Sequence, residues 1–106
     1  MIKNLPDVPI CLAEVIKIYK NQIVSTSFLE NEHVAINLLA FADLENVSKE
    51  KYLGDVLYYM VSGSCDIKTE DQTQHLNEGE ILKIDKDVLH ELCATEAFKI
   101  LQIIVN

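Results

Sequence analysis

Short apolar runs separated by polar turns dominate the chain from residue 22 onward. Runs rich in β-branched and apolar residues occupy 23–29, 34–42 and 56–61, followed by shorter ones at 65–69, 73–76, 81–84, 90–94 and 98–105. Turn-forming residues separate these runs, as at 77–79 and 85–87. Strands this short and regularly spaced, with no intervening helices, predict an antiparallel β-sandwich or barrel.

The first 21 residues follow a different pattern. Leu12, Val15, Ile16 and Tyr19 recur at helical intervals, so the spacing predicts a short amphipathic helix within residues 11–20. Residues 43–54 are mostly polar and are predicted to form a loop. The chain is therefore expected to form a single domain, 1–106, with an N-terminal arm and helix (1–21) and a β-domain (22–106).

The runs at 56–61 and 100–105 lack a polar face. One face of an antiparallel sheet is usually solvated, so something else is expected to cover the second face of these strands. The N-terminal helix and a second copy of the chain are both candidates. The second candidate predicts a homodimer.

The bulk composition excludes several kinds of partner. The formal net charge is −8 and no cluster of Lys or Arg is present, which argues against binding to nucleic acid or to an anionic membrane. The first residues lack the apolar core of a signal peptide, and no apolar run is long enough to span a membrane. The three cysteines have no CxxC spacing and are expected to be reduced thiols in a cytoplasmic protein.

Residues 79–90 carry the most informative motif: a turn glycine, a short apolar strand, an acidic turn and a histidine. This order resembles the second cupin motif, in which glycine, proline, glycine, histidine and asparagine stand at fixed spacing. In that frame Gly79 and His90 match the pattern. Asp85 and Asp87 replace the turn proline and glycine, and Ala94 replaces the asparagine. Aspartate also favours turns, so the resemblance to a cupin holds at this corner.

The first cupin motif, aligned on Gly63, is degenerate. Its glutamate position falls on Val56, and its two histidine positions fall on Lys49 and Lys51 or on Glu50 and Tyr52. The segments 22–25, 54–57 and 98–101 also resemble a group of short stand-alone bacterial cupins, in many of which a histidine stands at the position of Glu50. The resemblance implies an all-β cupin double-stranded β-helix, or jelly roll, over residues 22–106.

The resemblance also raises the question of a metal, because many cupins bind one through these motifs. A catalytic metal site needs about three protein ligands with one open position. Here His90 is the one aligned histidine, and Glu50 is the nearest carboxylate candidate. Asp55 has the wrong strand parity, since a shift by one residue turns a side chain to the other face. We therefore predict no cofactor, with a divalent metal at His90 and Glu50 as the alternative.

The candidates for lining a ligand pocket are His90, Tyr58 and Glu50. Tyr58 shares the parity of the inward motif position and should point into the barrel, whereas Tyr59 should point outward. His90 could orient a ligand, transfer a proton or simply pack. His33 and His75 are expected to face solvent.

We interpret the chain as a stand-alone cupin that binds a small molecule in the barrel without a tightly held metal. Two enzymatic alternatives stay open. One is a metal-dependent dioxygenase, lyase or isomerase. The other is a metal-free enzyme similar to sugar epimerases of this fold, with His90 as general base and Tyr58 as general acid. The sequence alone does not decide whether the protein is an enzyme.

Overall fold

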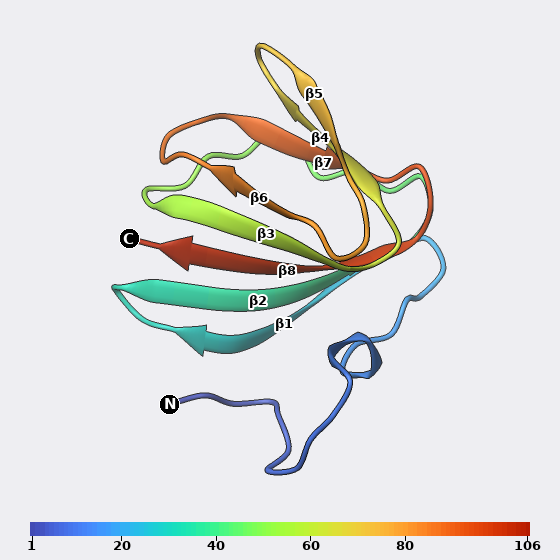
Figure 1. Cartoon of the computed structure of the whole chain (residues 1–106), viewed down its shortest axis with the longest axis vertical. Helices are drawn as coiled ribbons and strands as arrows, with labels where there is room; N and C mark the ends of the chain where they lie inside the picture. The colour runs from blue at the N-terminus through green and yellow to red at the C-terminus, as the bar shows by residue number, and fades with distance from the viewer.

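A computed structural model describes all 106 residues and shows eight strands in two antiparallel sheets (Figure 1). The larger sheet has the order β1-β2-β8-β3-β6, and the smaller has the order β5-β4-β7. Every strand predicted from the sequence is present, so the all-β prediction is confirmed. Their bounds are β1 Ile23–Glu30, β2 Val34–Phe41, β3 Asp55–Ser62, β4 Cys65–Thr69, β5 Thr73–Leu76, β6 Ile81–Ile84, β7 His90–Cys93 and β8 Phe98–Val105.

The main core lies between the two sheets. It is a cluster of 13 buried residues contributed by both sheets, with the stacked rings of Phe41 and Phe98 (centroids 4.5 Å apart) among them. Strand alternation explains which side chains enter it. Along β8 the residues at 98, 100, 102 and 104 are buried, and those between them point to the outer face of the large sheet. The inward-facing row of each strand therefore decides what a cavity inside the barrel could contact.

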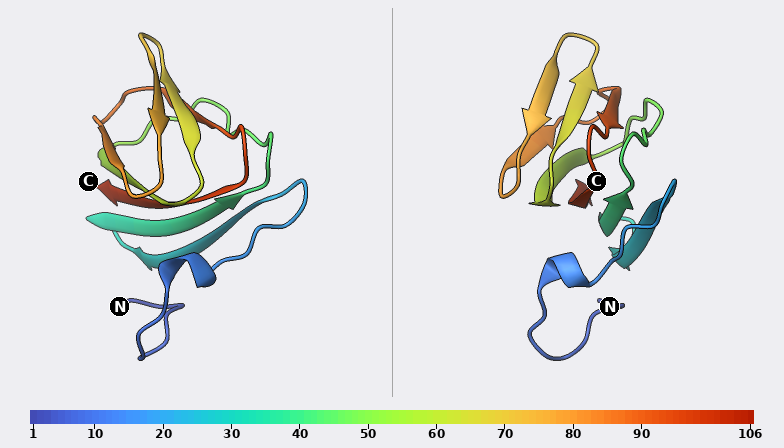
Figure 2. Two further views of the ribbon diagram at one scale, coloured as in Figure 1. Left: turned by 45° about the vertical axis from the view of Figure 1, so that its right-hand side comes forward. Right: turned by 90° about the vertical axis from the view of Figure 1, so that its right-hand side faces the viewer.

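The predicted N-terminal helix is wrong, because only one 3-10 turn forms there, η1 (Leu12–Glu14). A helix of about ten residues is marginal without tertiary support, and the β-branched Val15 and Ile16 weaken it further. After this turn the segment continues as a bend and irregular coil beside the large sheet and leads to β1 (Figure 2). There Ile16 is buried in a second, smaller cluster with Phe28 and Leu38. No helix of the structure is both long enough and apolar enough to cross a membrane.

The N-terminal segment covers only part of this outer face. Over β8, β3 and β6 the apolar side chains remain exposed or half-buried, with Ile81 at 62% and Val105 at 56% exposure. The homodimer stays a prediction, and this uncovered strip is where a second copy would pack. The strip is formed by Leu57, Tyr59, Ile81, Ile103 and Val105.

In gel filtration coupled to light scattering, we expect the wild-type protein to have twice the mass of one chain. The Ile81→Glu variant should elute as a monomer, because a charge buried in a dimer interface without a partner is strongly unfavourable. Glu70→Gln, on the β4–β5 turn, is the control and should not change the mass. A wild-type monomer at micromolar concentration would contradict the homodimer prediction.

The acidic turn before β7 adopts the geometry that a glycine would provide. Asp87 has a φ of 63°, in the left-handed region where the cupin motif has glycine. The Asp55 carboxylate accepts a hydrogen bond from the backbone N–H of Lys86 at 2.9 Å, which ties this turn to the start of β3. The turn sets the position of the residue that follows it, His90, at the start of β7.

Candidate functional site

The inner side of β7 begins with His90, which is only 3% exposed. Its backbone exchanges two hydrogen bonds of 2.9 Å with Glu50, on the loop between β2 and β3. A second bridge joins Asn46 to Cys93 further along β7. The polar segment 43–54 is a loop, as predicted, but these bridges fix it against the small sheet. As a result Glu50 and His90 are brought together at one edge of the barrel.

The imidazole of His90 is held at both nitrogens. Nδ1 lies 3.0 Å from the carbonyl oxygen of Val88, which can only accept, so Nδ1 carries the proton. Nε2 lies 2.8 Å from the hydroxyl of Tyr58, and in this tautomer it accepts the phenol's hydrogen bond. The Tyr58 ring also meets the imidazole edge-on, with centroids 5.6 Å apart. Both ring nitrogens of His90 therefore have hydrogen-bond partners.

Gln102 links this pair to the loop. Its Nε2 donates to the hydroxyls of Tyr58 and Tyr52, at 3.2 Å each, and its Oε1 accepts from Asn37 at 3.2 Å. The Tyr52 hydroxyl in turn donates to Oε2 of Glu50 at 2.6 Å. One continuous network therefore runs from the carboxylate of Glu50 to the ring of His90. The side-chain donors of His90, Tyr58, Tyr52 and Gln102 all have acceptors.

The network lines one side of a cavity of about 160 Å³ between the two sheets. This is smaller than the range of about 300–1,000 Å³ that is usual for ligand pockets, so a ligand must be very small. An apolar protein cavity of about 150 Å³ holds a molecule the size of benzene. The lining residues are Ile23, Leu39, Phe41, Val47, Glu50, Tyr52, Tyr58, His90, Leu92 and Gln102.

Both phenols of the cavity are neutral at ordinary pH. Burial, as the main cause, raises the pKa of Tyr58 well above its usual value. Burial and the hydrogen bond to Glu50 raise the pKa of Tyr52 to about 12. Glu50 is the one carboxylate in the lining, and its exposed side chain lies at the edge of the cavity.

The donor set does not fit a three-ligand metal site. The structure contains no group of three or more His, Cys, Asp or Glu side chains arranged to hold a metal ion. In the cavity only His90 and Glu50 are of these types, and His90 Nε2, the nitrogen facing inward, already accepts from Tyr58. Asp55 is exposed and binds the turn at Lys86, as its strand parity predicts.

The structure thus places all three sequence-predicted pocket residues, His90, Tyr58 and Glu50, in the lining of one cavity. Sequence reasoning missed Gln102 and Tyr52. A signal for Gln102 was available, because it is the one polar residue in the inward row of β8. Tyr52 lies in the loop, where no strand parity predicts its direction.

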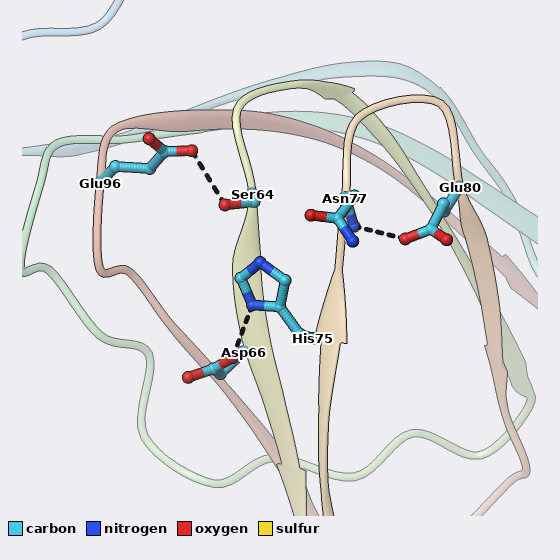
Figure 3. A network of polar contacts seen from close by, with 6 residues as sticks. All are labelled: Ser64, Asp66, His75, Asn77, Glu80 and Glu96. Atoms are coloured by element: carbon cyan, nitrogen blue, oxygen red, sulfur yellow. Dashed lines mark hydrogen bonds and ion pairs between the residues drawn. The ribbon is translucent and has the colours of Figure 1, made fainter.

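The other polar contacts lie outside the cavity. Figure 3 shows His75 beside Asp66 on the β4–β5 hairpin, where Nδ1 of His75 lies 2.8 Å from the Asp66 carboxylate. Nearby, Ser64 donates to Glu96 and the backbone N–H of Asn77 donates to Glu80. His75 is exposed, and so is His33, as expected from the sequence. These contacts stabilise the ends of the small sheet.

Two facing antiparallel sheets that enclose a lined cavity define a jelly-roll protein of the double-stranded β-helix type. The chain is similar to a cupin superfamily protein from Desulfitobacterium hafniense, with 36% identity over 99% of this chain and 97% of that one and a TM-score of 0.96. The chain belongs to the cupin superfamily.

Two further solved structures are similar to the chain. A conserved protein of unknown function from Streptococcus pyogenes is 22% identical over 99% of this chain and 93% of that one, with a TM-score of 0.95. A cupin 2 conserved barrel domain protein from Leptotrichia buccalis is 25% identical over 90% of this chain and 46% of that one, with a TM-score of 0.87. No family model and no curated protein matches the chain.

Proposed function

We propose that this cupin binds a very small organic molecule in the cavity between its two sheets, without a tightly held metal. The observation that carries the proposal is the division of the cavity wall. Leu39, Phe41, Val47 and Leu92 offer an apolar surface, and the hydrogen-bonded network forms the polar edge. A concave apolar site with a few fixed polar groups is the usual form of a small-molecule site.

The contacts of His90 favour binding over acid–base catalysis. A metal-free enzyme of the epimerase kind needs a base and an acid on either side of the substrate. Here the candidate base and acid, His90 and Tyr58, are hydrogen-bonded to each other at 2.8 Å. A carbonyl, that of Val88, rather than a carboxylate, orients the imidazole. Burial also raises the pKa of Tyr58, which makes its phenol a weaker acid.

A cavity-filling variant tests the proposal, with n-butanol as the probe. We expect n-butanol to bind the wild type with a dissociation constant on the order of 1 mM, given the usual free energy per non-hydrogen atom of small ligands. At about ten times that concentration, n-butanol should raise the melting temperature of the wild type by about 5 °C more than that of the filled variant Val47→Phe.

Val24→Phe serves as the matched control, because Val24 packs in the second cluster on the outer face. This variant should respond to n-butanol like the wild type. If wild type and Val47→Phe respond equally to n-butanol, the cavity is not a binding site and the proposal is wrong.

We also propose that the protein works in the cytoplasm. All three cysteines, Cys11, Cys65 and Cys93, are free thiols. Burial raises the pKa of Cys65 to about 12, which makes it a poor thiolate nucleophile. Its burial in the core supports a packing role in a reducing compartment.

A further inference from the structure

The hydrogen-bonding capacity left over in the cavity differs between donors and acceptors. The Nδ1–H of His90 donates to the carbonyl oxygen of Val88. The Tyr58 hydroxyl donates to Nε2 of His90, and the Tyr52 hydroxyl donates to the carboxylate of Glu50. Both N–H groups of the Gln102 amide go to the phenol oxygens. No side-chain donor of the residues that line the cavity is left for a ligand. An anion or a carbonyl compound would therefore leave water without a hydrogen bond to its oxygen in the cavity, which is unfavourable.

Acceptor capacity does remain, and it is concentrated at Glu50. Tyr52 donates to Oε2 of this carboxylate, whereas Oε1 has no hydrogen bond. None of the ion pairs in the structure involves Glu50, so no lysine neutralises it. Glu50 is the one carboxylate among the residues that line the cavity, and the lining contains no Lys or Arg.

The position of Glu50 and its surroundings also favour a cationic ligand. Glu50 is at the exposed edge of the cavity, and its backbone is fixed by two hydrogen bonds to His90. Most of the remaining lining is apolar and includes Leu39, Val47 and Leu92. The net charge of −8 attracts cations to the protein as a whole.

We infer that the ligand is a small alkylammonium, with its N–H donors on Glu50 and an apolar body of about four or five carbons in the cavity. This inference rests on the proposed function, because it assigns the ligand class of the same cavity. The size limit follows from the cavity volume of about 160 Å³. A charge-assisted hydrogen bond from ammonium to carboxylate is roughly twice as strong as a neutral one.

Three probes of equal length test the inference: n-butylammonium, n-butanol and n-butyrate, each titrated into the protein by NMR at constant ionic strength. We expect n-butylammonium to bind the wild type about fivefold to tenfold more tightly than n-butanol, and n-butyrate to bind weakest. In the Glu50→Gln variant the ratio of the amine and alcohol dissociation constants should fall to about 1. Glu45→Gln removes a charge from the same loop outside the cavity and should keep the wild-type ratio.

The outcomes separate the inference from the proposed function. If n-butanol or n-butyrate binds as tightly as the amine, and Val47→Phe abolishes that binding, the ammonium inference is overturned while the cavity remains a binding site. The same holds if Glu50→Gln keeps the preference for the amine. If none of the three probes binds, or if all three bind Val47→Phe as well as wild type, both the inference and the proposed function are overturned.

Discussion

Replacing Gly63 by alanine is expected to lower the free energy of unfolding by about 3 kcal/mol or more. Gly63 connects β3 to β4 with a φ of 81°, a conformation that costs other residues about 1–2 kcal/mol. A Cβ at this position would also lie 2.5 Å from the carbonyl oxygen of Ala97 and 2.9 Å from Cβ of Phe98. Neither atom is the free end of a flexible side chain. The turn between β3 and β4 and the start of β8 must therefore move apart.

Gly79→Ala is the matched control, because Gly79 has a similar φ of 84° but no atom lies within 4 Å of the position that its new methyl group would take. This substitution should lower the free energy of unfolding only by the cost of placing alanine at a positive φ, about 1 kcal/mol. Urea unfolding followed by circular dichroism measures both variants. Equal costs at the two glycines would contradict the close approach of Gly63 to β8, and with it the packing of the two sheets at this corner.

Tyr58→Phe is expected to lower the free energy of unfolding by about 1–3 kcal/mol, because it leaves two buried polar groups without a partner. Nε2 of His90 loses its hydrogen-bond donor, and one N–H of Gln102 loses its acceptor. Both residues are buried, at 3% and 5% exposure, so water cannot readily replace the phenol. Tyr59→Phe, one residue along β3 on the outer face, is the control and should change stability by less than about 0.5 kcal/mol.

The difference between Tyr58→Phe and wild type should also depend on pH. The pKa of Tyr58 is raised in the folded protein, so its contribution to stability is fully present below pH 10 and is lost as the pH rises through the higher folded value. The two proteins should therefore converge in stability above about pH 10, where the unfolded phenol ionises. A difference that stays constant from pH 8 to 11 would show that Tyr58 is not buried in the network.

The sheet region of this fold was predictable because its signals are local. Strand parity alone places Tyr58 inside and Tyr59 outside, and the motif around Gly79 and His90 identifies the turn before β7. The same parity rule applies to Gln102, the polar residue in the inward row of β8, although the sequence-based prediction did not include it.

The parts that sequence reasoning missed depend on tertiary contacts. Residues 11–20 have helical spacing, but only one 3-10 turn forms, and Ile16, in the bend after it, is buried in one cluster with Phe28. A short isolated helix is marginal on its own. Tyr52 reaches the cavity because the backbone of Glu50 pairs with His90, about forty residues away in the chain. No local pattern encodes that pairing. The sequence named Glu50 as a pocket candidate, but only the structure shows that one of its carboxylate oxygens is left without a hydrogen bond at the edge of the cavity.

The central claim is that the cavity between the sheets binds a small molecule, and methyl NMR tests it most directly. We predict that n-butylammonium produces saturable chemical-shift changes at the methyl groups of Leu39, Val47 and Leu92. The methyl groups of Ile103 and Val105, on the outer face, should not respond. Changes that stay linear in concentration, or that appear equally on both faces, would contradict the account.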